Sequence, residues 1–207
     1  KTDVMLGFLP FFHSFGFMAT IWMPLTNGFQ ITYIPNPLDV KDIAAAARKH
    51  KATLMIATPT FLAGYIRRIS QEDFAHLRYV IVGAEKLKER VGKSFEEKFG
   101  LYPLEGYGAT ELSPVVSLNL PNVLIDGVRQ IANYPGTVGH PIPGVAVKIV
   151  DPETFETLDV NSPGLLLIKG HNVMLGYLND PNKTNEVIKD GWYHTGDIAK
   201  LDDYGFI

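Results

Sequence analysis

Cysteine is absent from the 207-residue sequence. Its absence excludes disulfide bonds, thiolate metal sites and a cysteine nucleophile within this chain, and it leaves the cellular compartment open. Positive charge is not in excess either. The formal net charge is −3, so the chain offers no strongly basic surface to a nucleic-acid backbone. We therefore expect a protein that binds no nucleic acid.

Several catalytic motifs are also missing from the sequence. No Gly-x4-Gly-Lys-Ser/Thr phosphate loop occurs, which excludes a conventional P-loop enzyme. No two histidines have zinc-ligand spacing, His-Glu-x-x-His is absent, and the His-x4-Asp arrangement of acyltransferases does not occur. Ser14 lacks a glycine two positions before it, so the Gly-x-Ser-x-Gly pattern of hydrolases fails.

The composition is that of an ordinary globular protein, with 46% apolar and 20% charged residues. The length suits one large or two small domains. Residues 4–25 are apolar enough to raise the question of a membrane span, but Pro10, His13 and Pro24 interrupt them. We expect this stretch to form a short strand, a turn and a buried helix. A single Lys1 without a small-residue cleavage site argues against a signal peptide.

The two ends of the sequence are typical of cuts through a longer protein. It begins with Lys1-Thr2-Asp3, without an initiating methionine, and it ends on the strand-like Tyr204-Gly205-Phe206-Ile207. We therefore expect the chain to be a fragment.

The first 120 residues alternate between segments typical of strands and segments typical of helices. Asp39 can cap a helix that ends at the basic residues 48–50, and Leu87, Val91, Phe95 and Phe99 share one face of another that stops at Gly100. This alternation predicts an α/β subdomain over 1–120, a largely parallel sheet covered by helices on both faces. The expected strands are 4–8, 30–34, 53–57 and 79–82.

The character of the sequence changes after about residue 121, where glycine and proline become dense through 134–144. Strands are expected over 145–150 and 165–168, and one short helix near 181–188. We therefore predict a smaller β-rich subdomain over 121–207.

The segment Glu105-Gly106-Tyr107-Gly108-Ala109-Thr110-Glu111 carries the strongest local signal. Two glycines beside an aromatic ring let the backbone approach a flat ligand on which the ring stacks. Thr110 offers a hydroxyl to a phosphate oxygen, and Glu111 offers a hard oxygen ligand to Mg²⁺. The alternative is a glycine-rich turn with one packed tyrosine, and the motif alone does not separate the two.

Three further segments are candidates. Asp197, in Tyr193-His194-Thr195-Gly196-Asp197, can accept hydrogen bonds from ribose hydroxyls at the end of a tight turn, or it can cap its own backbone. The segment 82–86 ends a predicted parallel strand, where open α/β sheets bind ligands, but it also suits a plain loop. His13 lies among aromatics and can guard an apolar pocket or be a satisfied core histidine.

Taken in order, these segments resemble the adenylate-forming superfamily of acyl-CoA synthetases, luciferases and peptide-synthetase adenylation domains. The resemblance covers nearly the whole chain. It rests on Phe12-His13-Ser14-Phe15-Gly16, Gly83-Ala84-Glu85, Gly106-Tyr107-Gly108-Ala109-Thr110-Glu111, Gly170-His171-Asn172-Val173-Met174-Leu175-Gly176-Tyr177 and Tyr193-His194-Thr195-Gly196-Asp197.

The closer resemblance is to acyl-acyl carrier protein synthetases, which are often fused to a 2-acylglycerophosphoethanolamine acyltransferase. It rests on the segments 11–16, 60–65, 77–87 and 104–108. It implies a fatty acid as substrate, ATP and Mg²⁺ as cofactors, and a phosphopantetheine thiol as acceptor, carried by acyl carrier protein or, in the alternative, by CoA. We expect a cytoplasmic protein, and association of the full-length protein with the inner face of the membrane is left open.

The resemblance also implies a role for single residues. Tyr107 would stack on adenine, and Gly83, Ala84 and Glu85 would line its edge. Thr110 would hold the α-phosphate, Glu111 the Mg²⁺ and Asp197 the ribose. The implied catalytic residues are His13, Thr110 and Glu111; the nucleotide-binding residues are Gly83, Ala84, Glu85, Gly106, Tyr107, Gly108, Thr110 and Asp197; the residues along the acyl tunnel are His13, Phe15, Gly16, Val82, Gly108 and Leu112.

Two departures from the superfamily matter. Leu165 follows Gly164 where many members have a glutamate. The phosphate loop of these families would lie before Lys1, and their C-terminal domain would begin after Ile207, so we expect the fragment alone to be inactive. An acyl-CoA ligase and a non-catalytic nucleotide- or acyl-binding module remain as alternatives. A peptide-synthetase adenylation domain is disfavoured because 15–22 offers no aspartate for an amino group.

Overall fold

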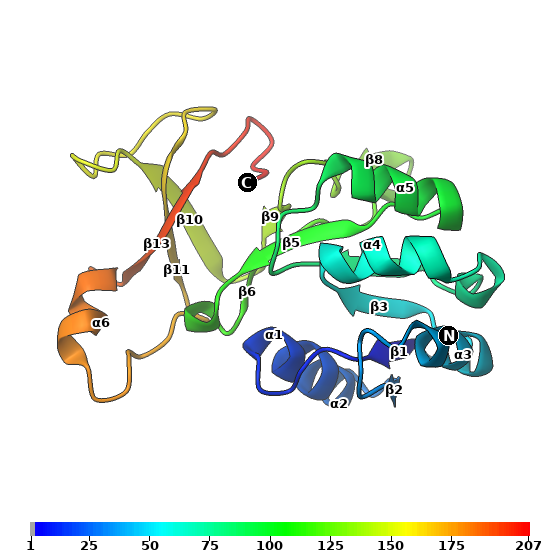
Figure 1. Ribbon diagram of the computed structural model, residues 1–207. Coiled ribbons are helices and arrows are strands. Elements are labelled where there is room, and N and C mark those ends of the chain that lie inside the picture. Colours follow the sequence, from blue (N-terminus) through cyan, green and yellow to red (C-terminus); the bar gives the residue numbers. More distant parts are fainter. Residues whose placement is uncertain (1–2) are drawn as a thin grey trace. The chain divides into compact units, whose positions relative to one another are not determined.

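The computed structural model describes residues 3–207 (Figure 1). The chain divides into two compact units, one ending at Glu105 and the other formed by Gly106–Ile207. The boundary predicted near residue 121 lies later in the chain than this division between Glu105 and Gly106. Lys1 and Thr2 of the predicted 1–120 subdomain lie outside the described residues.

The first unit is built on a parallel sheet in which the strands follow the order β2-β1-β3-β4-β5. All four predicted strands are present, so the predicted parallel sheet is confirmed. The last strand joins through Leu104 and Glu105, which lie in register with Ile81 and Val82. The strands are β1 (Val4–Gly7), β2 (Gln30–Tyr33), β3 (Leu54–Ala57), β4 (Tyr79–Val82) and β5 (Leu104–Gly108).

Helices connect these strands. The chain moves from β1 outward to β2 and then back across β1 to β3, β4 and β5. Because parallel crossovers are right-handed, this reversal puts the β1–β2 connection on one face of the sheet and the later helices on the other. Figure 1 shows two of these later helices, α4 and α5, side by side. The later helices are α3 (Val40–His50), α4 (Pro59–Arg68), the 3₁₀ turn η2 (Glu72–Phe74) and α5 (Glu89–Phe99).

The helix ends follow local sequence signals. Asp39 caps α3, and its carboxylate accepts from the Asp42 amide at 3.2 Å. Gly100 ends α5 with φ +75°, as predicted. The start of α4 was missed from the sequence, although Thr58 before Pro59 is a typical helix start: the Thr58 hydroxyl accepts from the Phe61 amide at 3.4 Å.

The predicted buried helix after β1 is present but only half buried. It runs without interruption through α1 (Ser14–Phe17), a π-helical turn η1 (Met18–Trp22) and α2 (Met23–Asn27). Its inner face is small, with Ala19 and Thr20 buried, whereas Trp22 is 48% and Leu25 70% exposed. The prediction of burial was wrong because apolar character extends around the whole helix, and the sheet covers one side only. Among the described residues, no helix combines the length and apolar character that crossing a bilayer requires.

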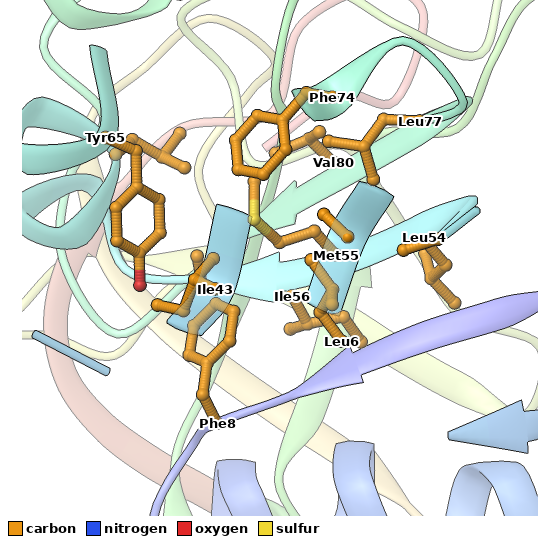
Figure 2. Close-up of a cluster of buried hydrophobic side chains, with 14 of the residues drawn as sticks. Leu6, Phe8, Ile43, Leu54, Met55, Ile56, Tyr65, Phe74, Leu77 and Val80 are labelled. Carbon is orange, nitrogen blue, oxygen red and sulfur yellow. The ribbon is translucent and has the colours of Figure 1, made fainter. Parts of the chain in front are cut away.

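The core of the first unit packs on both faces of the sheet, against the later helices and, through Ala19, against the β1–β2 connection. Figure 2 shows Met55 and Ile56 of β3 in a cluster with Ile43 of α3 and Tyr65 of α4. Met55 and Ile43 are fully buried. Truncation of such a side chain to alanine costs about 2–5 kcal/mol, so this cluster stabilises the packing of the helices on the sheet.

The second unit is mainly antiparallel. The end of β5 pairs with β6 and β6 with β9, and a separate four-stranded sheet has the order β10-β11-β13-β12. This agrees with the predicted smaller β-rich part, so the predicted fold class is confirmed. Its elements are η3 (Thr110–Leu112), β6 (Val115–Leu118), β7 (Val123–Ile125), β8 (Val128–Gln130), β9 (His140–Pro141), β10 (Val145–Val150), β11 (Gly164–Gly170), α6 (Pro181–Val187), β12 (Ile188–Lys189) and β13 (Trp192–Ala199).

Candidate functional site

The two glycines beside Tyr107 make room for the protein's own backbone. A β-carbon on Gly108 would lie 1.8 Å from the Pro114 carbonyl oxygen, and one on Gly106 would lie 2.9 Å from Leu118 Cδ1. The side of each glycine where a β-carbon would stand is therefore occupied by the returning chain at Pro114 and strand β6. These contacts make glycine necessary in the tight β5–β6 turn, which fixes the residues that follow Tyr107. The approach of a flat ligand to these glycines stays a prediction.

Thr110 and Glu111 lie on the 3₁₀ turn η3 between these two strands. Thr110 is exposed and Glu111 is half-buried. The turn is anchored by Leu112, which is fully buried in the core of the second unit with Val116 and Tyr193. A short rigid turn with a buried apolar anchor presents the hydroxyl and the carboxylate outward from a fixed backbone.

Tyr107 and Asp197 are in direct contact. The Tyr107 hydroxyl donates a hydrogen bond to Asp197 Oδ2. Burial first, and then this hydrogen bond, raise the pKa of Tyr107 above its usual value. Tyr107 therefore stays a neutral donor, and the exposed Asp197 carboxylate has further lone pairs for other donors.

Asp197 lies in a bulge of strand β13, and the predicted tight turn was wrong. Leu165 and Leu167 of β11 have Ile198 and His194 as register partners, so the residues 195–197 bulge out of the ladder. The Thr195 hydroxyl donates to the Leu166 carbonyl at 2.8 Å and accepts from the Asp197 amide at 3.0 Å. Gly196 has φ +80°, a conformation that favours glycine.

Glu111 also has a tyrosine partner. The Tyr177 hydroxyl donates to Glu111 Oε1 at 2.8 Å. This bond is the main cause that raises the pKa of Tyr177. Tyr193 is buried, and burial raises its pKa, with the charges of Glu111 and Asp197 and a hydrogen bond with Tyr177 adding to the shift. The second unit thus brings together two carboxylates and three tyrosines.

Tyr177 and Tyr193 are functional candidates that sequence reasoning did not assign. Both lie in segments that carry the resemblance, 170–177 and 193–197. No local spacing rule relates a phenol to a carboxylate more than sixty positions away, as Tyr177 is to Glu111. Only the fold reveals these pairs.

The donor set of the second unit fits a cation that arrives with a nucleotide. Among the described residues, no three histidine or acidic side chains gather into a group that could hold a metal ion by themselves. Mg²⁺ is usually held by one or two carboxylates together with substrate phosphates and water. The single carboxylate of Glu111 fits that arrangement.

In the first unit, the segment Gly83–Glu85 directly follows β4. Ala84 has φ +67°, which is uncommon for a residue with a β-carbon. Glu85 Oε2 accepts from the Thr60 hydroxyl at 2.6 Å, and the buried Glu105 accepts from the Leu87 amide at 2.8 Å. These bonds hold the loop at both sides, with Ala84 and Glu85 exposed.

His13 is an exposed helix cap in this structure, neither a core histidine nor a residue packed in an apolar pocket. Its Nδ1 accepts from the Phe15 amide at 3.2 Å. Gly16 is required at its position, since a β-carbon would lie 2.1 Å from the Pro10 carbonyl oxygen. Phe15 packs partly against the core of the first unit.

Two residues of the predicted acyl tunnel are core residues. Val82 and Leu112 are both fully buried, each in the hydrophobic core of its own unit. Their place along an acyl tunnel stays a prediction.

Comparison with known proteins places this geometry in a family. A family model for AMP-binding enzymes matches residues 1–178. The chain is 36% identical, over its whole length, to a probable 4-coumarate–CoA ligase of Dictyostelium discoideum, and 33% identical to a long-chain-fatty-acid–CoA ligase of Salmonella typhimurium. It spans 36% and 35% of these relatives' lengths, about a third of each.

Solved structures agree with these relatives. The ATP-bound chimera B3 of RpMatB and BxBclM superposes with a TM-score of 0.87 at 31% identity, over 99% of this chain and 39% of the other. Apo MatB from Rhodopseudomonas palustris gives the same TM-score at 30% identity and the same coverage. The chain belongs to the family of AMP-binding enzymes.

Proposed function

We propose that the protein containing this chain is an ATP-dependent acyl-CoA ligase. In the first half-reaction a carboxylate oxygen attacks the α-phosphorus of ATP, which forms acyl-AMP and releases pyrophosphate. In the second, a thiolate attacks the acyl carbonyl and AMP leaves. The observation that carries the proposal is the pairing of Tyr107 with Asp197 in a chain of the AMP-binding family.

The nucleotide would be held by residues of the second unit. Tyr107 would stack on adenine, which is worth about 1–3 kcal/mol. Asp197 would accept from the ribose hydroxyls, since its carboxylate can serve more donors than Tyr107 alone. Thr110 would donate to the α-phosphate. The resemblance assigns Gly83, Ala84 and Glu85 to the edge of adenine, and that assignment stays a proposal.

Mg²⁺, when bound with ATP, would neutralise charge on the phosphates. Glu111 is the residue that we propose as its protein ligand. Tyr177 engages Glu111 Oε1, so Oε2 is the atom proposed for the cation.

The substrate class proposed here is a fatty acid. The named relatives act on long-chain fatty acids and, as a probable activity, on 4-coumarate. Each buried methylene contributes about 0.8 kcal/mol, so a long chain would supply much of the binding free energy. His13, Phe15 and Gly16 remain the proposed contacts near the carboxylate.

CoA is the acceptor that we propose, in place of the acyl carrier protein that the closer resemblance implied. The two curated relatives named above are CoA ligases. Acyl carrier protein remains the rival acceptor, and a cytoplasmic location remains a prediction.

Pyrophosphate exchange into ATP tests the first half-reaction. The complete protein would be assayed with acetate, medium-chain acids, long-chain acids, 4-coumarate and amino acids. Exchange that depends on long-chain acids supports the proposal. The same preparation would then be given CoA or acyl carrier protein, and acyl-thioester formation would identify the acceptor. If no acid supports exchange, a non-catalytic nucleotide- or acyl-binding module replaces the proposal.

A further inference from the structure

Residues 171–177 carry part of the family resemblance, yet no role has been assigned to them. In the second unit this segment, called the bracing segment here, follows β11 and precedes α6. It contacts the turn that presents Thr110 and Glu111 at several points. These contacts suggest that it controls the geometry of the proposed cation ligand.

The backbone of the turn is fixed first. Asn172 Nδ2 donates to the Leu112 carbonyl at 3.0 Å and to the Val115 carbonyl at 3.1 Å. The Met174 amide donates to the Glu111 carbonyl at 2.8 Å. Three carbonyl groups between Glu111 and Val115 thus accept from one short segment. Because an amide that bridges two carbonyls fixes their separation, the turn has little freedom to move relative to the bracing segment.

The Glu111 side chain is fixed next, by the Tyr177 hydroxyl at 2.8 Å from Oε1. Tyr177 is itself anchored by α6: its amide donates to the Thr184 hydroxyl at 2.8 Å, and Lys183 Nζ lies 5.0 Å from its ring centroid. Gly176 has φ +153°, and a β-carbon there would lie 2.9 Å from Thr184. The phenol is therefore placed by contacts independent of the hydrogen bond that it makes.

We propose that Tyr177 is a positioning residue for Glu111: its hydroxyl fixes Oε1 so that Oε2 is held ready for Mg²⁺. This inference rests on the proposed function. Carboxylates that bind metals are commonly held by an outer hydrogen-bond partner, and removal of that partner costs 10–100-fold in metal affinity or activity as a general rule. Without Tyr177, the Glu111 side chain would be ordered only when the cation binds. The entropy lost in that ordering would then lower the affinity for the cation.

The test uses four variants of the complete protein: Tyr177→Phe, Glu111→Gln, the double variant, and Tyr134→Phe as a matched control. Tyr134 is a 56% exposed tyrosine of the same unit that is not part of the proposed site. Mn²⁺ serves as the probe, and its binding to the protein–ATP complex is followed by electron paramagnetic resonance. This readout needs no turnover. Pyrophosphate exchange as a function of Mg²⁺ concentration is the second readout.

Tyr177→Phe should weaken Mn²⁺ binding about tenfold and raise the Mg²⁺ concentration for half-maximal exchange by a similar factor. Tyr134→Phe should change neither. In the Glu111→Gln background, Tyr177→Phe should add nothing, because its effect acts through the carboxylate. An unchanged Mn²⁺ affinity, or an equal loss in the wild-type and Glu111→Gln backgrounds, overturns the positioning role. If the wild-type protein binds no ATP, the proposed function fails as well, and that result is seen before any variant is compared.

Discussion

Ninety positions apart in the sequence, Tyr107 and Asp197 are joined by a hydrogen bond from the tyrosine hydroxyl to Oδ2. Tyr107 comes from the end of β5 and Asp197 from the bulge in β13. The ring predicted to stack on adenine and the carboxylate predicted to bind ribose are therefore neighbours within one unit. Base and sugar are also neighbours in a nucleotide, which makes the pair testable with altered nucleotides.

Two replacements of Tyr107 should distinguish the contribution of the ring to ATP binding from that of the hydroxyl. Tyr107→Ala removes the stacking surface and should weaken ATP binding by about 1–3 kcal/mol, or roughly 5–150-fold. Tyr107→Phe keeps the ring and should cost less, on the order of 1 kcal/mol, because Asp197 loses one donor only. Isothermal titration calorimetry with ATP measures both. Equal losses for the two variants would contradict stacking.

The role of Asp197 should appear as discrimination between sugars. Wild-type protein should bind ATP about tenfold or more tightly than 2′-deoxy-ATP or 3′-deoxy-ATP, since a hydrogen bond to a charged group contributes about 1.5–3 kcal/mol. Asp197→Ala should bind all three nucleotides weakly and almost equally. A variant that still prefers ATP would place the ribose elsewhere. Asp203→Ala, which removes an exposed carboxylate paired with Asn161, is the control.

Gly108 should tolerate no side chain. A β-carbon would meet the Pro114 carbonyl oxygen at 1.8 Å, so Gly108→Ala should force β5 and β6 apart and lower the free energy of unfolding by about 2–4 kcal/mol. Gly127→Ala is the matched control in the same unit: Gly127 has φ +80° but no atom within 4 Å of the added carbon. It should cost about 1 kcal/mol. Urea denaturation measures both, and equal costs would show that steric contact at Gly108 is unimportant.

Glu105 should make stability depend on pH. Burial raises the pKa of this carboxyl above 4.5. A raised folded-state pKa means that the folded chain binds the proton more tightly than the unfolded chain. The contribution is therefore present below pH 4.5 and is lost as the pH rises through the folded-state pKa. Glu105→Gln, which keeps an acceptor for the Leu87 amide, should show a smaller fall over that range. If the urea midpoints of the wild-type protein and of Glu105→Gln change equally with pH, Glu105 is not the source of the pH dependence.

Local signals predicted the framework of the first unit well. Asp39 before an amphipathic segment and Gly100 after one mark helix ends through backbone chemistry that a sequence displays directly. The short apolar strands of the first unit were equally predictable from the sequence. Thr58-Pro59 is a local signal of the same kind, and it marks the start of α4. The exposed face of the helix over 14–27 was not predictable, because hydrophobicity does not say which side a sheet will cover.

The candidate site was only partly predictable for a different reason. Tyr107, Glu111 and Asp197 were proposed from chemistry and resemblance, but their tyrosine partners arise from contacts between distant segments. The interior of strand β13 was predicted to be a turn, because the bulge at 195–197 interrupts the alternation by which strands are recognised. The close contact of Gly108 with the Pro114 carbonyl was not predictable either, because it depends on how the chain turns between β5 and β6.

The bracing segment has an uneven tolerance to change as a consequence of its two anchors. Asn172 and Tyr177 each donate a hydrogen bond to the same turn, so the chain between them must span a fixed distance. An inserted or deleted residue would therefore break one of these two hydrogen bonds. Leu175, between them, is fully exposed. Position 175 can therefore be substituted, for example with a polar side chain or a labelled residue, whereas the number of residues in the bracing segment is constrained.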